Sequence, residues 1–152
     1  MKFTLNTLGA PNWDLEETAR NARAYGYAGV DLRLLDGEVI TLESVRANRE
    51  RLRALFPKGE LPVAVLATSV RLATADPAVR KKTLDEAREW IDLAAELGVP
   101  VIRYFAARNP PELDLERSIQ AVGEMLAQLS ERATAAGVKI GVSTSVKPWE
   151  SK

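Results

Sequence analysis

Two residue types are absent from this sequence, cysteine and histidine. Without cysteine the chain has no disulfides, no thiolate nucleophile and no thiolate metal ligand. Without histidine it has no Ser-His-Asp triad and no side chain whose ordinary pKa lies near neutrality. Acid–base catalysis would therefore depend on carboxylates, lysine or tyrosine with shifted pKa values. The sequence leaves open whether these absences are natural or engineered.

An excess of charge of either sign is also missing. Lys and Arg together number 21, as do Asp and Glu, so the formal net charge is +0. This balance argues against a nucleic-acid partner, which a basic excess or stripe would favour. No apolar run approaches the roughly 20 residues of a membrane span, and residues 1–6 contain no apolar signal core. We therefore expect one cytoplasmic domain over residues 1–152, with no membrane partner.

A glycine signal recurs along the chain where a predicted helix gives way to a predicted strand. It stands at Gly26, Gly98 and Gly137, with a weaker copy at Gly59. Glycine just past a helix takes the left-handed conformation that turns the chain toward the next strand. The intervals match the length of one strand–helix unit. The sequence thus predicts a series of such units.

Helix starts are marked by capping signals at Asp14 with Glu17, at Thr41, and at Asp76 before Pro77. Apolar side chains recur at steps of three and four in the two longest predicted helices. Together with the glycines, these signals predict strands near 3–7, 29–34, 62–68, 100–105 and 138–143, and helices near 14–25, 42–55, 78–97 and 112–136.

Polar and apolar side chains alternate in several predicted strands. The second strand places Val30, Leu32 and Leu34 on one face. It places Asp31 and Arg33 on the other. A flavodoxin-like sheet is buried on both faces, so its strands read as continuous apolar runs. Alternation favours the wall of a barrel with a polar lumen. We predict an α/β fold, a partial TIM barrel of about five parallel strands with four helices on one face.

In a TIM barrel the functional site lies at the carboxyl ends of the strands. The candidate residues there are Asn6, Asp31, Arg33, Ser69, Arg71 and Arg103. The three arginines could hold a small anionic or sugar ligand through its phosphate or carboxylate group. In the alternative interpretation, Asp31 pairs with Arg33 and Arg103 and only neutralises a packed lumen.

Three segments of the sequence resemble a known family. The runs at 29–38, 65–72 and 101–105 are similar to the sugar phosphate isomerase/epimerase family, which belongs to the xylose-isomerase-like TIM barrels. The likeness covers essentially the whole chain but only the first five of the family's eight strands. It implies a metal-dependent isomerase or epimerase of sugars.

The sequence departs from that family at the end of the fifth strand. Family members commonly carry a metal-ligand glutamate there, followed two residues later by a histidine. In this chain the two positions are Ser143 and Ser145, while Thr144 between them is kept. A hydroxyl does not replace a carboxylate or an imidazole as a ligand for a divalent metal. We therefore expect no catalytic residues, no bound metal and no cofactor.

Two functions remain open. The first is a non-catalytic barrel fragment, natural or engineered, that self-associates as a homodimer through its open sheet edges. A monomer in which residues 146–149 fold over the lumen, with Trp149 as a plug, is the alternative to the dimer. The second function is a sugar isomerase or epimerase whose active site another chain completes. A DNA-repair endonuclease of the same superfamily is disfavoured by the neutral charge.

Overall fold

The computed structural model describes residues 2–106 and 113–143. In chain order its elements are β1 (Leu5–Asn6), the 3-10 helix η1 (Thr7–Gly9), α1 (Leu15–Ala24), β2 (Val30–Leu32), β3 (Leu34–Leu35), β4 (Glu38–Val39), α2 (Leu42–Ala47), α3 (Arg49–Leu55), β5 (Val63–Arg71), α4 (Pro77–Leu97), β6 (Val101–Phe105), α5 (Leu115–Ala135) and β7 (Lys139–Ser143). The five strands and the helices predicted from the sequence are present near their expected bounds.

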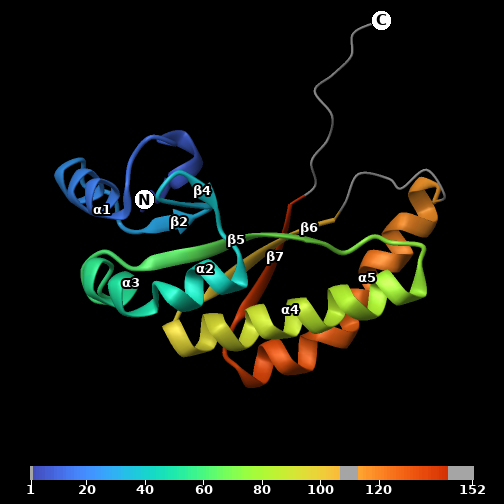
Figure 1. The fold of residues 1–152 in the computed structure, drawn as a ribbon. Coiled ribbons are helices and arrows are strands. Elements are labelled where there is room, and N and C mark those ends of the chain that lie inside the picture. Colours follow the sequence, from blue (N-terminus) through green and yellow to red (C-terminus); the bar gives the residue numbers. More distant parts are fainter. Residues whose placement is uncertain (1, 107–112, 144–152) are drawn as a thin grey trace, which may run out of the picture.

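Five of the strands form one sheet in the order β1-β2-β5-β6-β7, and every neighbouring pair is parallel (Figure 1). One or two helices follow each of the first four strands of this sheet. This strand–helix alternation with a parallel sheet confirms the predicted partial TIM barrel. The sheet is open, because β1 and β7 lie at its two edges and each pairs with one strand.

The two faces of the sheet differ as the alternation predicted. Leu32, Leu66 and Ile102 are register partners on three adjacent strands and are completely buried. Burying a side chain of this kind stabilises the fold by about 1.5–3 kcal/mol. Asp31 and Arg103 are sequence neighbours of Leu32 and Ile102, so they lie on the opposite face of the sheet, and they are only partly buried. The apolar row therefore faces the helices, and the polar positions face the lumen.

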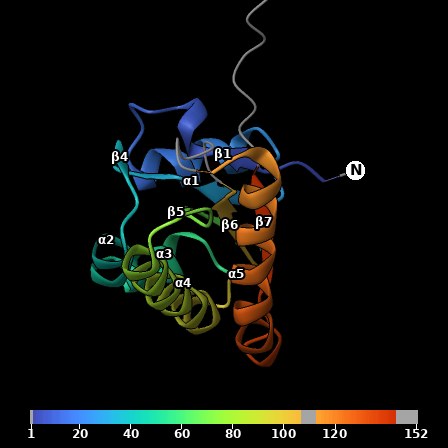
Figure 2. The ribbon, with the colours of Figure 1, turned by 90° about the vertical axis from the view of Figure 1, so that its right-hand side faces the viewer.

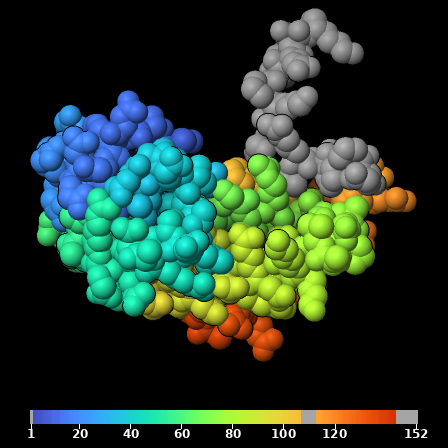
Figure 3. All heavy atoms as spheres, in the orientation of Figure 1, coloured from blue at the N-terminus to red at the C-terminus, as the bar shows by residue number. Residues whose placement is uncertain are grey.

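The helices cover the apolar face and pack against one another. α1 contacts α3, α2 contacts α4, and α4 contacts α5 as well as β5 and β6 (Figure 2). Figure 3 shows the surfaces of α2, α3 and α4 on one face of the molecule. Trp90 and Ile91 of α4 lie in the core beneath it. Within the described ranges, no helix has both the length and the apolar composition of a membrane span.

The predicted capping residues begin the helices. The Asp14 side chain accepts a hydrogen bond from the Glu17 backbone N–H at 2.7 Å. Thr41 and Ser44 form a reciprocal capping box at the start of α2. Asp76 accepts from the first turn of α4. Each cap satisfies a backbone N–H that has no partner within its helix.

Three of the four helix-to-strand glycines have the left-handed conformation that the sequence predicted. The φ angles are 74° at Gly26 and 67° at both Gly98 and Gly137. Gly59, the weaker copy, has no positive φ. The chain there leaves α3 through a different turn, so the glycine signal was correct only where it was strong.

The helix predicted over 42–55 is wrong in one respect, because the chain forms two helices. α2 ends at Asn48, whose φ and ψ are −102° and 13°. The Asn48 side-chain amide donates to the Ser44 carbonyl at 3.0 Å. The Ser44 carbonyl also accepts from the Asn48 backbone N–H at 3.2 Å, so Asn48 closes α2 with both groups, and asparagine is a residue of low helix propensity.

The strand predicted over 29–34 is also corrected. β2 ends at Leu32, and β3 then pairs antiparallel with β4 in a two-stranded hairpin. Asp36 and Gly37 form the turn, with φ angles of 52° and 85°. A two-residue hairpin turn with positive φ at both positions favours the Asp-Gly pair.

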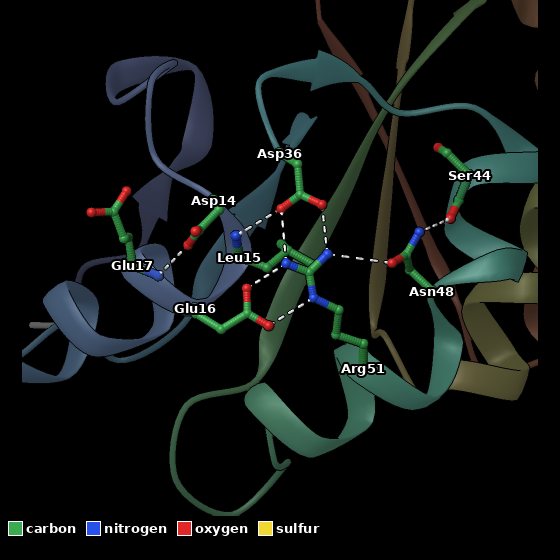
Figure 4. Close-up of polar contacts among 8 residues, drawn as sticks. All are labelled: Asp14, Leu15, Glu16, Glu17, Asp36, Ser44, Asn48 and Arg51. Carbon is green, nitrogen blue, oxygen red and sulfur yellow. Dashed lines mark hydrogen bonds and ion pairs between the residues drawn. The ribbon is translucent and has the colours of Figure 1, made fainter.

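A polar network attaches this hairpin to the helices (Figure 4). Arg51 of α3 donates to the carboxylates of Glu16 on α1 and Asp36 in the turn. The other contact of Asp36 is with the Leu15 backbone N–H, from which Oδ1 accepts at 2.9 Å. One arginine thus joins α1, α3 and the hairpin.

Candidate functional site

The carboxyl ends of the strands bring the predicted arginines to one edge of the sheet. Arg71 at the end of β5 is a register partner of Phe105 at the end of β6, and Phe105 is in turn a partner of Ser143 at the end of β7. Arg33 follows directly after β2. This is the edge at which TIM barrels carry their active sites.

Three guanidinium groups surround the ring of Phe105. The guanidinium carbons of Arg103, Arg71 and Arg33 lie 4.0, 5.3 and 5.8 Å from the ring centroid. A guanidinium within about 6 Å of an aromatic centroid is attracted by the ring quadrupole. We call these three arginines and Phe105 the arginine cluster. It combines side chains from β2, β5 and β6, far apart in the sequence.

Small residues leave room for the Arg103 side chain. Its register partners are Ala67 on β5 and Gly141 on β7. Alternate residues of a strand share a face, so Phe105 lies on the same side of β6 as Arg103. The Arg103 side chain can therefore lie along the sheet toward the Phe105 ring.

The Arg33 side chain has a defined position. Its Nη1 donates to the Ala67 carbonyl at 3.0 Å and to Ser69 Oγ at 2.9 Å. Its backbone N–H donates to Thr7 Oγ1 at 2.9 Å, and so does the next backbone N–H, at Leu34, at 2.7 Å. Buried Thr7 thus holds the chain where it leaves β2, and β5 holds the guanidinium.

Burial and mutual repulsion act on two of the arginines. Loss of solvent, with the neighbouring charge of Arg71, lowers the pKa of Arg33. Loss of solvent, with the neighbouring charge of Arg33, lowers the pKa of Arg103. Arg103 Nη1 is buried and has no hydrogen-bond partner within the described residues. The cluster therefore carries concentrated positive charge with donor capacity left over.

The alternative interpretation, in which Asp31 pairs with Arg33 and Arg103, is not what the structure shows. Within residues 2–106 and 113–143, no ion pair includes any of these three side chains. Asp31 Oδ1 is buried without a partner there. Burial raises the pKa of Asp31, and the Thr4 side chain opposes that shift. The strand register explains why Asp31 and Arg103 are apart. Asp31 is a register partner of Val65 on β5, whereas Arg103 is a register partner of Ala67, two residues further along β5.

The remaining predicted site residues have different surroundings. Asn6 caps the 3-10 helix, with its Oδ1 accepting from the Leu8 backbone N–H at 2.9 Å. Ser143 ends β7, and its carbonyl accepts from the Ala106 backbone N–H at 3.1 Å. Ser145 and the proposed plug residue Trp149 lie outside the described residues.

The residues present do not fit the metal site of the resembled family. Ser143 offers a hydroxyl where that family places a carboxylate. In the described part of the chain, no three Asp or Glu side chains gather where they could hold one ion. Mg²⁺ and Mn²⁺ prefer carboxylate and other charged or carbonyl oxygens. No metal-dependent step is therefore assigned to this edge.

The sequence interpretation missed two features of the site. Phe105 was not recognised as the centre of the arginine cluster, although its position two residues after Arg103 places both on one face. Thr68 was not recognised as a link between strands, and its hydroxyl donates to the Arg103 carbonyl at 3.0 Å. No local signal marks Thr68, because its partner lies 35 residues away.

A cavity of about 270 Å³ lies away from this cluster, between the end of α3, the start of β5 and the end of α4. Its walls include the apolar side chains of Leu52, Phe56 and Leu66. The Lys58 side chain lies directly over Gly98 there. The cavity is therefore separate from the carboxyl-end site.

Comparison with known proteins gives a family match and a set of similar folds. A family model described as "Xylose isomerase-like TIM barrel" matches residues 19–145. The search of curated proteins gave no match.

Among solved structures, the IOLI protein with a bound zinc atom has a TM-score of 0.78 and 18% identity, covering 95% of this chain and 51% of its own. The E. coli 3-keto-D-glucoside 4-epimerase YcjR has a TM-score of 0.72 and 20% identity, covering 93% and 55%. A D-tagatose 3-epimerase-like protein has a TM-score of 0.64 and 21% identity, covering 93% and 52%. The chain thus has the fold of part of these barrels and spans about half their length.

Proposed function

Because the chain belongs to the xylose isomerase-like TIM barrel family, we propose that its 152 residues form a non-catalytic barrel module that self-associates. The open five-stranded sheet carries this proposal. A further feature supports it, the chemistry of Ser143 at the end of β7.

The residues at the end of β7 support the absence of catalysis by this chain alone. Ser143 is neutral, and a neutral hydroxyl binds a divalent cation far more weakly than a carboxylate does. The chain also has no histidine to serve as a base or a ligand.

The edges of the sheet support self-association. Among residues 2–106 and 113–143, β7 pairs only with β6, and β1 pairs only with β2. Strand edges carry backbone groups that readily pair with another chain. The Val142 side chain at the β7 edge is 38% exposed, and Phe3 beside β1 is 60% exposed. A two-fold dimer would cover such edges, and closed dimers are the commonest assembly of this type.

Three measurements on the purified 152-residue chain test the proposal. Metal analysis after purification without chelator should find no stoichiometric divalent metal. Assays with added Mn²⁺ or Mg²⁺ should find no isomerase or epimerase turnover of free or phosphorylated sugars. Sedimentation velocity at several concentrations should show a monomer–dimer equilibrium.

Ser143→Ala is the matched control for the first two measurements. If Ser143 is not a ligand, the variant behaves as the unmodified chain does. Stoichiometric metal that Ser143→Ala loses, or turnover that Arg33→Ala loses, would overturn the non-catalytic proposal. A monomer at every concentration would overturn self-association.

A second candidate function is a sugar isomerase or epimerase whose site another chain completes. The coverage values favour it, because the matched solved structures have about twice the length of this chain. This function requires metal-dependent turnover by a complex of two different chains, with none from either chain alone. Turnover by the 152-residue chain alone would contradict both candidate functions.

A further inference from the structure

We infer that the arginine cluster, formed by Arg33, Arg71, Arg103 and Phe105, is a binding site for a small anion, namely the phosphate or carboxylate group of a sugar-sized molecule. This inference is independent of self-association and of catalysis. It rests on the geometry of the cluster, on its unbalanced charge and on the polar groups at its border.

The geometry gathers donors at one place. The three guanidinium carbons lie between 4.0 and 5.8 Å from one ring centroid. Each guanidinium has five N–H donors in a planar fork that matches a carboxylate or a phosphate. Arg33 uses Nη1 for Ala67 and Ser69, and the structure gives its other nitrogens no partner among the described residues. Donors therefore remain for a ligand.

The charge of the cluster is not balanced by the described protein. Elsewhere in the chain, other arginines pair with carboxylates, as Arg80 does with Glu124 and Arg132 does with Asp92. No described carboxylate pairs with Arg33, Arg71 or Arg103. Like charges in a partly buried place are costly when nothing opposes them. A bound anion would offset that cost.

The buried donor of Arg103 supports the same conclusion. A buried polar atom without a partner is uncommon and destabilises the protein. Arg103 Nη1 is such an atom in the described structure. Arg71 of the cluster and Ser69, which bonds to Arg33, are exposed, so a small ligand can reach the cluster from solvent.

Polar groups around the cluster suit a ligand that carries hydroxyls next to its anionic group. Ser69 lies against Arg33, and Ser143 is a register partner of Phe105. Hydroxyl side chains both donate and accept, so they complement sugar hydroxyls. A sugar phosphate or a sugar acid therefore fits better than an apolar carboxylate.

Calorimetric titration of the 152-residue chain with four probes tests the inference. The probes are inorganic phosphate, a hexose phosphate, a hexonic acid and the corresponding neutral hexose. We expect the three anions to bind, the neutral hexose not to bind, and the affinity to fall as salt is added. Tighter binding of the hexose phosphate than of inorganic phosphate would assign the hydroxyl contacts to the site.

Two variants make the test specific. Arg71→Gln removes an exposed cluster arginine and should weaken anion binding about tenfold. Arg20→Gln is the matched control, because Arg20 is an exposed arginine of α1 that pairs only with Glu17 among described residues, and it should leave binding unchanged. The melting temperature of each variant verifies its folding.

Two outcomes would overturn the inference. One is the absence of any heat of binding with all three anions at millimolar concentration. The other is equal loss of binding in Arg71→Gln and Arg20→Gln, which would mean that the anions respond only to overall charge.

Discussion

Arg51 Nη1 lies 2.5 Å from Asp36 Oδ2 and so joins α3 to the turn of the β3–β4 hairpin. The same guanidinium bonds to Glu16 of α1. These contacts lower the pKa of Glu16 to about 2, chiefly through the hydrogen bonds from Arg51. They also lower the pKa of Asp36. The local fold around the hairpin thus depends on ionised carboxylates.

The first prediction concerns stability in acid. A carboxyl group whose folded pKa is depressed stabilises the protein fully above its unfolded pKa and loses that effect as the pH falls through the folded value. For Glu16 the window runs from 4.5 down to about 2. Thermal melts across this range should show a smaller pH dependence for Glu16→Gln than for the unmodified chain.

Glu131→Gln is the control for this prediction, because Glu131 makes no ion pair within the described residues and lies exposed on α5. Its melting temperature should follow that of the unmodified chain at every pH. Identical acid profiles for Glu16→Gln and Glu131→Gln would show that the Arg51 contact does not persist in solution.

The second prediction concerns Asp31, whose contribution to stability changes with pH in the direction opposite to that of Glu16. Burial raises the pKa of Asp31, so the fold is favoured while the carboxyl group is neutral, below its unfolded pKa, and loses that stability as the pH rises through the folded value and the group ionises. Asp31→Asn removes the buried charge and should therefore raise the free energy of unfolding at pH 7. The gain should vanish near pH 3.

Urea unfolding at the two pH values measures this difference, with Asp85→Asn on the exposed face of α4 as the control. A loss of stability at pH 7 in Asp31→Asn would mean that Asp31 has an ionic partner in solution. That result would restore the ion-pair interpretation of the lumen.

The sequence predicted the sheet because its signals are local and repeated. Alternation in residues 30–34 indicated which face meets the helices, and buried Leu32 beside partly buried Asp31 and Arg33 bears it out. Asp14 and Thr41 marked helix starts through bonds that span three residues. Signals of this range depend only on residues close in the sequence, so they can be recognised without knowledge of the tertiary fold.

The hairpin and the arginine cluster were harder for different reasons. The Asp36-Gly37 pair is a recognised hairpin signal, but the prediction placed one strand over 29–34 and no hairpin around this pair. The arrangement around Phe105 depends on the register of β5 against β6, which shifts between Ala67 and Arg71. No pattern within either segment specifies such a shift. The topology predicted that the three arginines would lie at one edge of the sheet. It did not predict that all three would lie close to the ring of Phe105.

The third prediction concerns the helix-facing core. Leu66 is completely buried between Leu32 and Ile102. Leu66→Ala removes its apolar contacts and leaves a cavity, which should cost about 3 kcal/mol. Leu8→Ala makes the same chemical change at a side chain that is 60% exposed, so it should cost little. Urea unfolding measures both, and equal losses would contradict the assignment of this face to the core.

The fourth prediction concerns the open edge at β7. The Lys139 N–H donates to the Pro100 carbonyl, and the Ser143 carbonyl accepts from the Ala106 N–H. In a parallel ladder, alternate residues bond to the same neighbour. The N–H of Val142, between these positions, therefore points away from β6 toward the open edge. Val142→Pro should remove that donor without breaking the β6–β7 ladder.

Val142→Ala is the matched control, because it shortens the same side chain but keeps the N–H. If β7 pairs with a second copy through its backbone, Val142→Pro should raise the dimer dissociation constant about tenfold or more, while Val142→Ala remains close to the unmodified chain. Sedimentation velocity over a concentration series measures all three. Equal weakening by both variants would assign the contact to the Val142 side chain and not to strand pairing. A dimer that neither variant weakens would place the interface elsewhere, because only the proline removes the backbone donor that edge pairing at this position requires.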